Sequence, residues 1–260
     1  MSKVTDRLDN KQIVELAKKQ YETQKQQSKF PANIITLPSQ GKVYAETSVL
    51  KSGKVEMRHM TAYDEDILSN SSYISDGVIF NKLLEALIIT PGVDIDELVI
   101  GDKEWLIISA RILGYGNEYA VSVTDAKTDK PISATLDLSK LKSRQFDKDS
   151  DIDGYFEYIV ASNNDVIKFK YLSATDANKI DNQSINSTFL KMSIHAVNGN
   201  TDVNTIEDYL KYELRAMDSR KLRKYIVESA PGINYETEAV DDKGATYPAT
   251  FQFKLDLFWF

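Results

Sequence analysis

The sequence predicts a mixed α+β protein: two similar small units (strand, helices, β-hairpin) preceded by an N-terminal helical arm. Three observations support this. Segments with helical spacing alternate with short strand-like runs, the same order of elements occurs twice, and an aspartate-rich stretch separates the two occurrences. The composition, 42% hydrophobic and 27% charged, is that of a globular chain with a sizeable core.

The first 52 residues are predicted to form an amphipathic helix and an extended arm. Ile13, Leu16, Ala17 and Tyr21 recur on one helical face, which indicates a short amphipathic helix. Two interpretations stay open, because such a helix packs on its own chain or lays its apolar face in a groove of a partner. Under the second interpretation Ile13, Leu16 and Tyr21 are partner-binding residues.

The first α+β unit is expected over residues 53–146. A compact, partly alternating run over 55–60 predicts a strand. Thr61 follows as the expected helix N-cap, with a hydroxyl that accepts a hydrogen bond from a backbone amide. Asp64 and Glu65 would stabilise the positive end of the same helix.

Two apolar helices and a hairpin complete this unit. The helices are expected over residues 77–89 and 103–113, and glycine-containing turns end both of them. Strands over 119–123 and 132–138, joined by a polar turn, predict the β-hairpin.

The second unit, with its linker, is assigned to residues 147–260 and repeats this order. The stretch 143–154 carries alternating aspartates and is expected to be a linker outside the core. Residue identity between the halves is low, so a tandem duplication rests on element order and spacing alone. The expected elements are a strand over 166–171, a helix that opens at Ser173, an apolar helix over 188–197, a helix ending at Leu214, a helix over 218–228 and a final hairpin over 234–260.

The last residues form the most apolar alternating pattern in the chain. Phe251, Phe253, Leu255, Leu257 and Trp259 alternate with other residues, which predicts a strand with one apolar face. Burying each large side chain is worth roughly 1.5–3 kcal/mol. The strand therefore either completes the sheet of its own chain or docks on a partner. The candidate partner-binding residues here are Leu257, Phe258, Trp259 and Phe260.

Charge and composition exclude several classes of function. A formal net charge of −7 argues against a general nucleic-acid binder and against a polybasic membrane anchor. The absence of cysteine excludes disulfides and thiolate metal sites. No run approaches the roughly 20 apolar residues that span a bilayer. We expect folding in the cytosol, with no cofactor, no nucleic-acid partner and no membrane partner.

The sequence contains no arrangement typical of an enzyme. It has no phosphate-binding loop, no dinucleotide fingerprint and no nucleophile elbow. His59 and His195 are each isolated from other metal-ligating residues, so packed structural roles are expected. The alternative is a metal-dependent enzyme that uses Asp94, Asp96 and Asp102. These carboxylates lie near expected helix starts, where they stabilise the helix dipole, so the prediction is a non-enzymatic protein that docks on partners.

Several motifs, taken in order, carry a resemblance to a known family. They are Leu37-Pro38-Ser39-Gln40-Gly41-Lys42-Val43-Tyr44, Met60-Thr61-Ala62-Tyr63-Asp64-Glu65-Asp66-Ile67-Leu68, Ile100-Gly101-Asp102, Arg111 to Tyr119, Met217-Asp218-Ser219-Arg220, Ala230-Pro231-Gly232 and the aromatic terminus. In this set the chain resembles the T4-type bacteriophage baseplate family, whose members are hub components or hub-assembly factors of contractile tails.

The resemblance implies a structural protein or assembly chaperone that acts in baseplate hub assembly. The implied partners are other hub or tape-measure proteins. The implied location is the host cytoplasm during assembly, and a place in the virion tail stays open. Relatives often carry Cys-x-x-Cys pairs on the hairpin turns, which suggests zinc ribbons. Here Thr124, Lys127, Val240 and Lys243 stand at those positions, so no metal is carried over.

Overall fold

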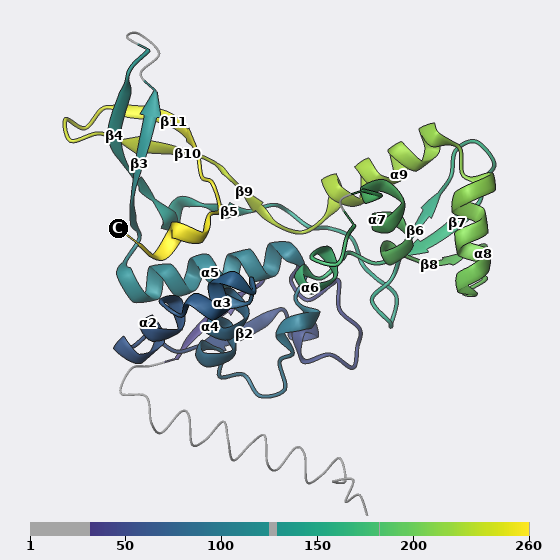
Figure 1. The fold of residues 1–260 in the computed structure, drawn as a ribbon, viewed down its shortest axis with the longest axis horizontal. Coiled ribbons are helices and arrows are strands. Elements are labelled where there is room, and N and C mark those ends of the chain that lie inside the picture. The colour runs from purple at the N-terminus through teal and green to yellow at the C-terminus, as the bar shows by residue number, and fades with distance from the viewer. Residues whose placement is uncertain (1–31, 125–128, 182, 260) are drawn as a thin grey trace, which may run out of the picture.

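The structure is a computed structural model that describes residues 32–124, 129–181 and 183–259. It consists of two α+β bodies that lie side by side and a small four-stranded sheet next to the first body (Figure 1). The predicted α+β class is confirmed. The predicted helix that contains Ile13, Leu16 and Tyr21 lies outside the described residues.

The first body combines a two-stranded antiparallel sheet with a group of helices. Strand β1 (Asn33–Thr36) pairs with β2 (Lys54–Met57), where the sequence predicts a strand. The helical elements of this body are η1 (Val49–Ser52), α2 (Ala62–Leu68), α3 (Ser71–Ser75), α4 (Ile79–Leu87), η2 (Ile95–Glu97) and α5 (Ile100–Tyr115). Helix α5 crosses between the other helices of this body and the four-stranded sheet (Figure 1).

Helix α2 begins where the sequence predicts, at Thr61 as N-cap. Thr61 and Asp64 form a capping box, and the Thr61 hydroxyl lies 3.0 Å from the Asp64 carboxylate, to which it can also donate. The Thr61 backbone amide also donates to Asp64, at 2.7 Å, and Arg58 forms two hydrogen bonds with the same carboxylate. Asp64 therefore fixes the helix start against the end of strand β2.

The second body has a three-stranded antiparallel sheet in the order β6 (Phe156–Ile159), β7 (Val166–Phe169), β8 (Ile194–Val197). Its helices are α6 (Ala174–Ala177), α7 (Ile185–Ser193), α8 (Val203–Asp208), the π-helical turn η4 (Tyr209–Glu213) and α9 (Ala216–Ser229). The predicted helix over 188–197 is wrong in its last turn, because α7 ends at Ser193 and the next residues pair with β7.

The two hairpins form one sheet. Strands β3 (Glu118–Thr124) and β4 (Pro131–Asp137) form the first hairpin, and β10 (Glu236–Val240) and β11 (Thr246–Thr250) form the second. The strand order is β11-β10-β4-β3. The first predicted hairpin is confirmed, and the second is present but ends at Thr250 instead of continuing to residue 260. The pairing of β10 with β4, which joins the two hairpins, is a long-range contact that no local pattern indicates.

A narrow ribbon connects the four-stranded sheet to the second body. After a short 3-10 turn, η3 (Leu138–Lys140), strand β5 (Lys142–Ser143) pairs antiparallel with β9 (Ile233–Asn234). The predicted linker over 143–154 is only partly outside the core, because Phe146 is buried against Phe156 and Tyr171. The proposed boundaries 1–52, 53–146 and 147–260 stay predictions, and strand pairing crosses both of them.

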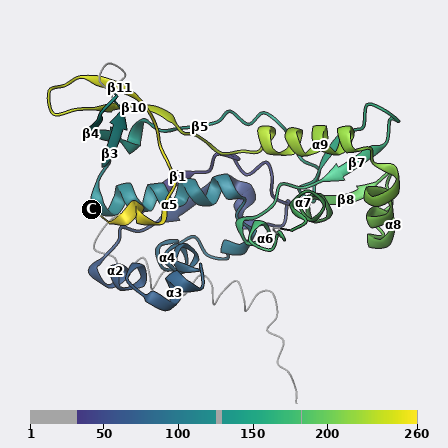
Figure 2. The same ribbon diagram turned by 45° about the horizontal axis from the view of Figure 1, so that its top comes forward.

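The C-terminal residues do not form the predicted strand. Strand β11 ends at Thr250, and residues 255–258 form the 3-10 turn η5 (Leu255–Phe258). This segment lies along α5 (Figure 2). The Phe258 ring packs against Tyr115 and Phe80, with ring centroids 6.2 Å apart in each pair. Packing on the apolar surface of the helices therefore determines the conformation of this segment. The alternation of apolar residues in its sequence does not.

A buried carboxylate connects the Leu37–Tyr44 loop to α5. Asp102, in the first turn of α5, is fully buried. It accepts hydrogen bonds from the Ser39 amide at 2.9 Å, the Ser39 hydroxyl at 2.5 Å and the Tyr44 hydroxyl at 2.7 Å. Burial raises the pKa of the Asp102 carboxyl, and these hydrogen bonds oppose the shift. The Tyr44 hydroxyl also accepts a hydrogen bond from the Val99 amide, at 3.2 Å, which closes the network.

We predict that Asp102→Asn destabilises the protein by about 2–4 kcal/mol, because the amide replaces an ionic acceptor of three hydrogen bonds with a weaker one and a competing donor. Urea unfolding of the full chain measures this loss. The control is Asp66→Asn, an exposed aspartate of α2, which should change the free energy of unfolding by less than about 0.5 kcal/mol. Equal unfolding midpoints for the two variants would contradict the role given to Asp102.

Candidate functional site

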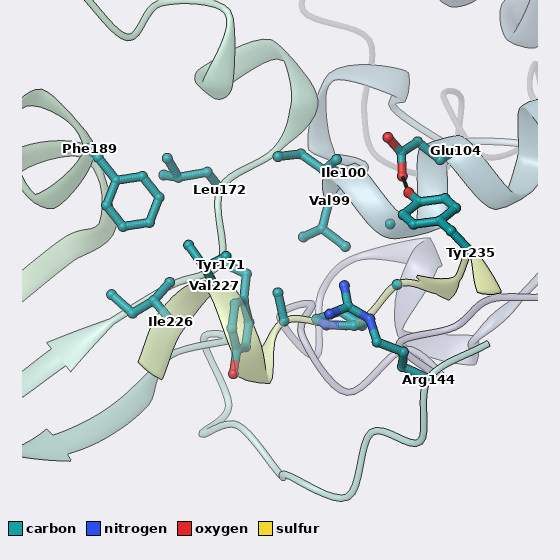
Figure 3. A pocket seen from close by; sticks show the side chains of 14 residues that line it. Val99, Ile100, Glu104, Arg144, Tyr171, Leu172, Phe189, Ile226, Val227 and Tyr235 are labelled. Carbon is teal, nitrogen blue, oxygen red and sulfur yellow. Dashed lines mark hydrogen bonds between the residues drawn. The ribbon is translucent and has the colours of Figure 1, made fainter. Parts of the chain in front are cut away.

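A cavity of about 220 Å³ lies at the junction of the two bodies (Figure 3). The start of α5 supplies one wall, with Ile100 and Glu104, and the end of α9 supplies another, with Ile226 and Val227. Phe189 of α7 projects from the second body into the same space (Figure 3). Most of the lining is apolar, so the cavity suits an apolar side chain better than a charged one.

One side of this junction cavity is polar. The Tyr235 hydroxyl donates a hydrogen bond to the Glu104 carboxylate, and Arg144 lines the cavity nearby. Burial raises the pKa of Glu104, while Tyr235 and the Arg144 guanidinium oppose that shift. Arg144 is held in place through its backbone amide, which donates to the Gly232 carbonyl at 2.8 Å. These groups can orient a bound partner group through hydrogen bonds.

The close approach of the two bodies depends on a glycine. A Cβ atom at Gly101 would lie 2.2 Å from the Pro231 carbonyl oxygen. The first turn of α5 therefore packs directly on the Pro231-Gly232 backbone. Two of the motifs in the family resemblance, Ile100-Gly101-Asp102 and Ala230-Pro231-Gly232, meet at this contact.

The three aspartates of the enzyme alternative do not share a site. Asp94 accepts a hydrogen bond from the Asp96 amide at the start of η2. Asp96 accepts hydrogen bonds from Thr175 at 2.6 Å and Asn81 at 3.2 Å, whereas Asp102 is enclosed under the Ser39 loop. Among residues 32–124, 129–181 and 183–259, no group of three metal-ligating side chains gathers. The structure therefore brings Asp94 and Asp96 near each other but places Asp102 apart from them.

Both histidines have packing roles. The His59 ring lies between two polar partners, with Nε2 3.0 Å from Asn33 Nδ2 and Nδ1 3.0 Å from the Leu113 carbonyl. The His195 ring, in β8 and not in the predicted helix, stacks on Tyr155 with centroids 4.0 Å apart. Both histidine rings are therefore engaged in contacts within the chain.

The candidate partner-binding residues at the C-terminus lie in different environments. Leu257 and Phe258 are buried in the chain's own core, and Trp259 is 40% exposed. Arg111, itself 2% exposed, donates to the Leu257 carbonyl at 3.0 Å and to the Gly116 carbonyl at 2.7 Å. Phe260 and the N-terminal candidates Ile13, Leu16 and Tyr21 lie outside the described residues. Within the described set, Trp259 is thus the C-terminal candidate with accessible aromatic surface.

No helix in the described part of the chain is long and apolar enough to cross a membrane.

The described residues define a mixed α+β protein in which polar groups secure the packing of two bodies and a shared sheet. A family model described as T4 bacteriophage base plate protein matches residues 34–243, which include both bodies and most of the sheet. The chain belongs to this family, so the resemblance carried by its motifs is confirmed. Its members are phage baseplate proteins, which gives the chain a structural role in contact with other proteins of the virion tail. No curated protein and no solved structure matches the chain.

We predict that Phe258→Ala lowers the free energy of unfolding by about 3–5 kcal/mol, because the ring is 4% exposed and its removal leaves a cavity beside Phe80 and Tyr115. Chemical unfolding of the isolated chain measures the loss. Tyr63→Ala is the matched control, since Tyr63 is 85% exposed, and it should shift stability by less than about 0.5 kcal/mol. A Phe258→Ala protein as stable as the control would show that this ring is not part of the core.

We predict that chelation leaves the fold unchanged. The hairpin positions Thr124, Lys127, Val240 and Lys243 offer no thiolate, and Asp94, Asp96 and Asp102 accept hydrogen bonds within the protein. Thermal unfolding with and without excess EDTA should give the same Tm within about 1 °C. A lower Tm in EDTA, restored by a divalent metal, would contradict this prediction and revive the metal-dependent alternative.

Proposed function

We propose that this protein is a non-enzymatic structural or assembly protein of a contractile phage tail. It acts in baseplate hub assembly by docking on other hub or tape-measure proteins, in the host cytoplasm during assembly. The observation that carries the proposal is the baseplate family match, which extends across both bodies and three of the four strands of the shared sheet.

The junction cavity supports docking as the mode of action. Its rim exposes two aliphatic side chains, Ile100 at the start of α5 and Val227 on α9. Beside them Glu104 and Arg144 provide hydrogen-bonding groups. Protein interfaces commonly combine a small apolar centre with a polar rim, and this arrangement is present at the junction cavity. Trp259, together with Ile13, Leu16, Tyr21 and Phe260, stays a second proposed contact region.

A duplicated architecture is part of the same proposal. Asp102 and Asp218 both occupy the third position of a long helix, and both are buried. Asp102 accepts a hydrogen bond from Ser39, three residues after β1, and Asp218 accepts one from Ser162, three residues after β6, at 2.7 Å. The same hydrogen bond from a serine to a buried aspartate, at the same position in both halves, supports a common origin of the halves.

A second similarity between the halves is an ion pair at the start of the first helix after a strand. Asp64 pairs with Arg58 six residues earlier, at 2.7 Å, and Asp176 pairs with Lys170 six residues earlier, at 3.2 Å. In both cases the basic residue directly follows the last residue of the strand, and the aspartate is the third residue of the helix. The two ion pairs therefore agree both in their spacing along the chain and in their chemistry.

The proposed function is tested by following the chain during infection. Affinity purification of a tagged chain from infected cells, followed by mass spectrometry, should recover hub or tape-measure proteins. Mass spectrometry of purified mature tails then separates a resident component from a chaperone that departs. If neither tails nor assembly intermediates contain the protein, the proposal fails.

A paired substitution tests the junction cavity as the docking surface. Val227→Lys places a charge on the apolar rim and should reduce recovery of the partners at least tenfold. The control is Val203→Lys on α8, another exposed valine of the second body, which should leave recovery unchanged. Equal recovery with both variants would place the docking surface elsewhere.

A further inference from the structure

The two edge strands of the four-stranded sheet differ in how strongly they resist pairing with another strand. Strand β11 is one edge and carries Pro248 at its centre, and a proline without an N–H group discourages pairing with another strand. Strand β3 is the other edge and has seven residues, with no proline and no lysine. Its one charged residue is Glu118, at its beginning. Among the described strands none pairs with the outer side of β3. Arg111 binds the Glu118 carbonyl on that side, and the residues after Glu118 can accept a further strand.

The backbone register shows which groups of β3 point away from the sheet. The Leu138 amide donates to the Asn117 carbonyl at 2.8 Å, so Asn117 occupies a position bonded to β4. Bonded and non-bonded positions alternate in an antiparallel pair. Ala120, Ser122 and Thr124 consequently direct their N–H and C=O groups outward. Arg111 agrees with this assignment, because its side chain reaches the Glu118 carbonyl from outside the ladder, at 3.1 Å.

We propose that a second copy of this chain pairs antiparallel with β3, with the two-fold axis at Val121. In this register Ala120 lies opposite Ser122 of the second copy, and Ser122 lies opposite its Ala120. The outward groups of one strand then meet the outward groups of the other, as an antiparallel ladder requires. The two sheets join into one continuous sheet across the dimer. This self-association goes beyond the proposed docking on other tail proteins.

The side chains of β3 are complementary to themselves in this register. Tyr119 faces Val123 of the second copy, a pairing of aromatic and β-branched residues that is favourable between neighbouring strands. Val121 faces its own equivalent. Glu118 faces Thr124, so no two like charges are opposed.

The two faces of β3 also fit a continuous sheet. Tyr119 and Val121 are half-buried and Val123 is buried on the inner face, where the Tyr119 ring packs on Phe251 at 5.9 Å. A second copy continues this apolar face past the present edge. On the outer face Ala120 and Ser122 are exposed and small, so their cross-strand pair in the dimer brings no bulky side chains together.

Sedimentation velocity of the full chain tests the proposal, and a dimer is expected at micromolar concentration. The variant Ala120→Lys/Ser122→Lys should be a monomer, because the introduced ammonium groups face one another across the two-fold axis. The control is Thr246→Lys/Thr250→Lys on the β11 edge, which should stay dimeric. Circular dichroism melting of each variant verifies that it is folded. A monomeric wild type, a dimeric Ala120→Lys/Ser122→Lys variant or a monomeric control overturns the proposal.

Spin labels locate the contact directly, since the chain contains no cysteine. A label at Ser133→Cys, on the outer face of β4, would lie about three strand spacings of ~4.8 Å from its equivalent in the dimer. A label at Thr246→Cys would lie about seven spacings away, on the order of 30 Å. Electron paramagnetic resonance should thus show a short distance for the first label and a long one for the second. The reverse order, or equal distances, overturns pairing through β3.

Discussion

The whole structure depends on the polar groups that helix α5 buries. Near its start Asp102 accepts hydrogen bonds from Ser39 and Tyr44, which fixes the N-terminal loop of the first body. The neighbouring Gly101 lets the backbone of the second body approach the same turn. Near the end of the helix Arg111 binds the carbonyls of Leu257 and Glu118, and so joins the C-terminal segment to the sheet. A buried charge without such partners is costly, so these contacts hold the Ser39 loop, the C-terminal segment and β3 against α5.

This arrangement separates the surfaces that are available for function. The start of α5 lies in the wall of the junction cavity, whereas its end supports the sheet and the C-terminal turn (Figure 1). A partner bound at the cavity and a second copy bound at β3 would therefore occupy opposite ends of one helix. A rigid element between two surfaces fixes the geometry of the contacts made at them.

Local signals predicted the elements whose structure local chemistry determines. The cap at Thr61 and the two hairpins follow from residues close in sequence, and the structure has them in place. Residues 194–197 and 251–259 were predicted wrongly because distant partners decide their conformation, strand β7 in one case and the surface of α4 and α5 in the other. The junction cavity could not be predicted either, since Glu104 and Tyr235 are 131 positions apart in sequence.

Helix α5 is thus the common support of both bodies and the sheet. Hydrogen exchange of the intact protein, followed by mass spectrometry of peptides, tests it most directly. We expect the α5 amides to exchange last, at the rate of global unfolding, and Asp102→Asn to accelerate exchange in the Ser39 loop and in α5 together. Early exchange of α5, while the second body and the sheet stay protected, would contradict the claim.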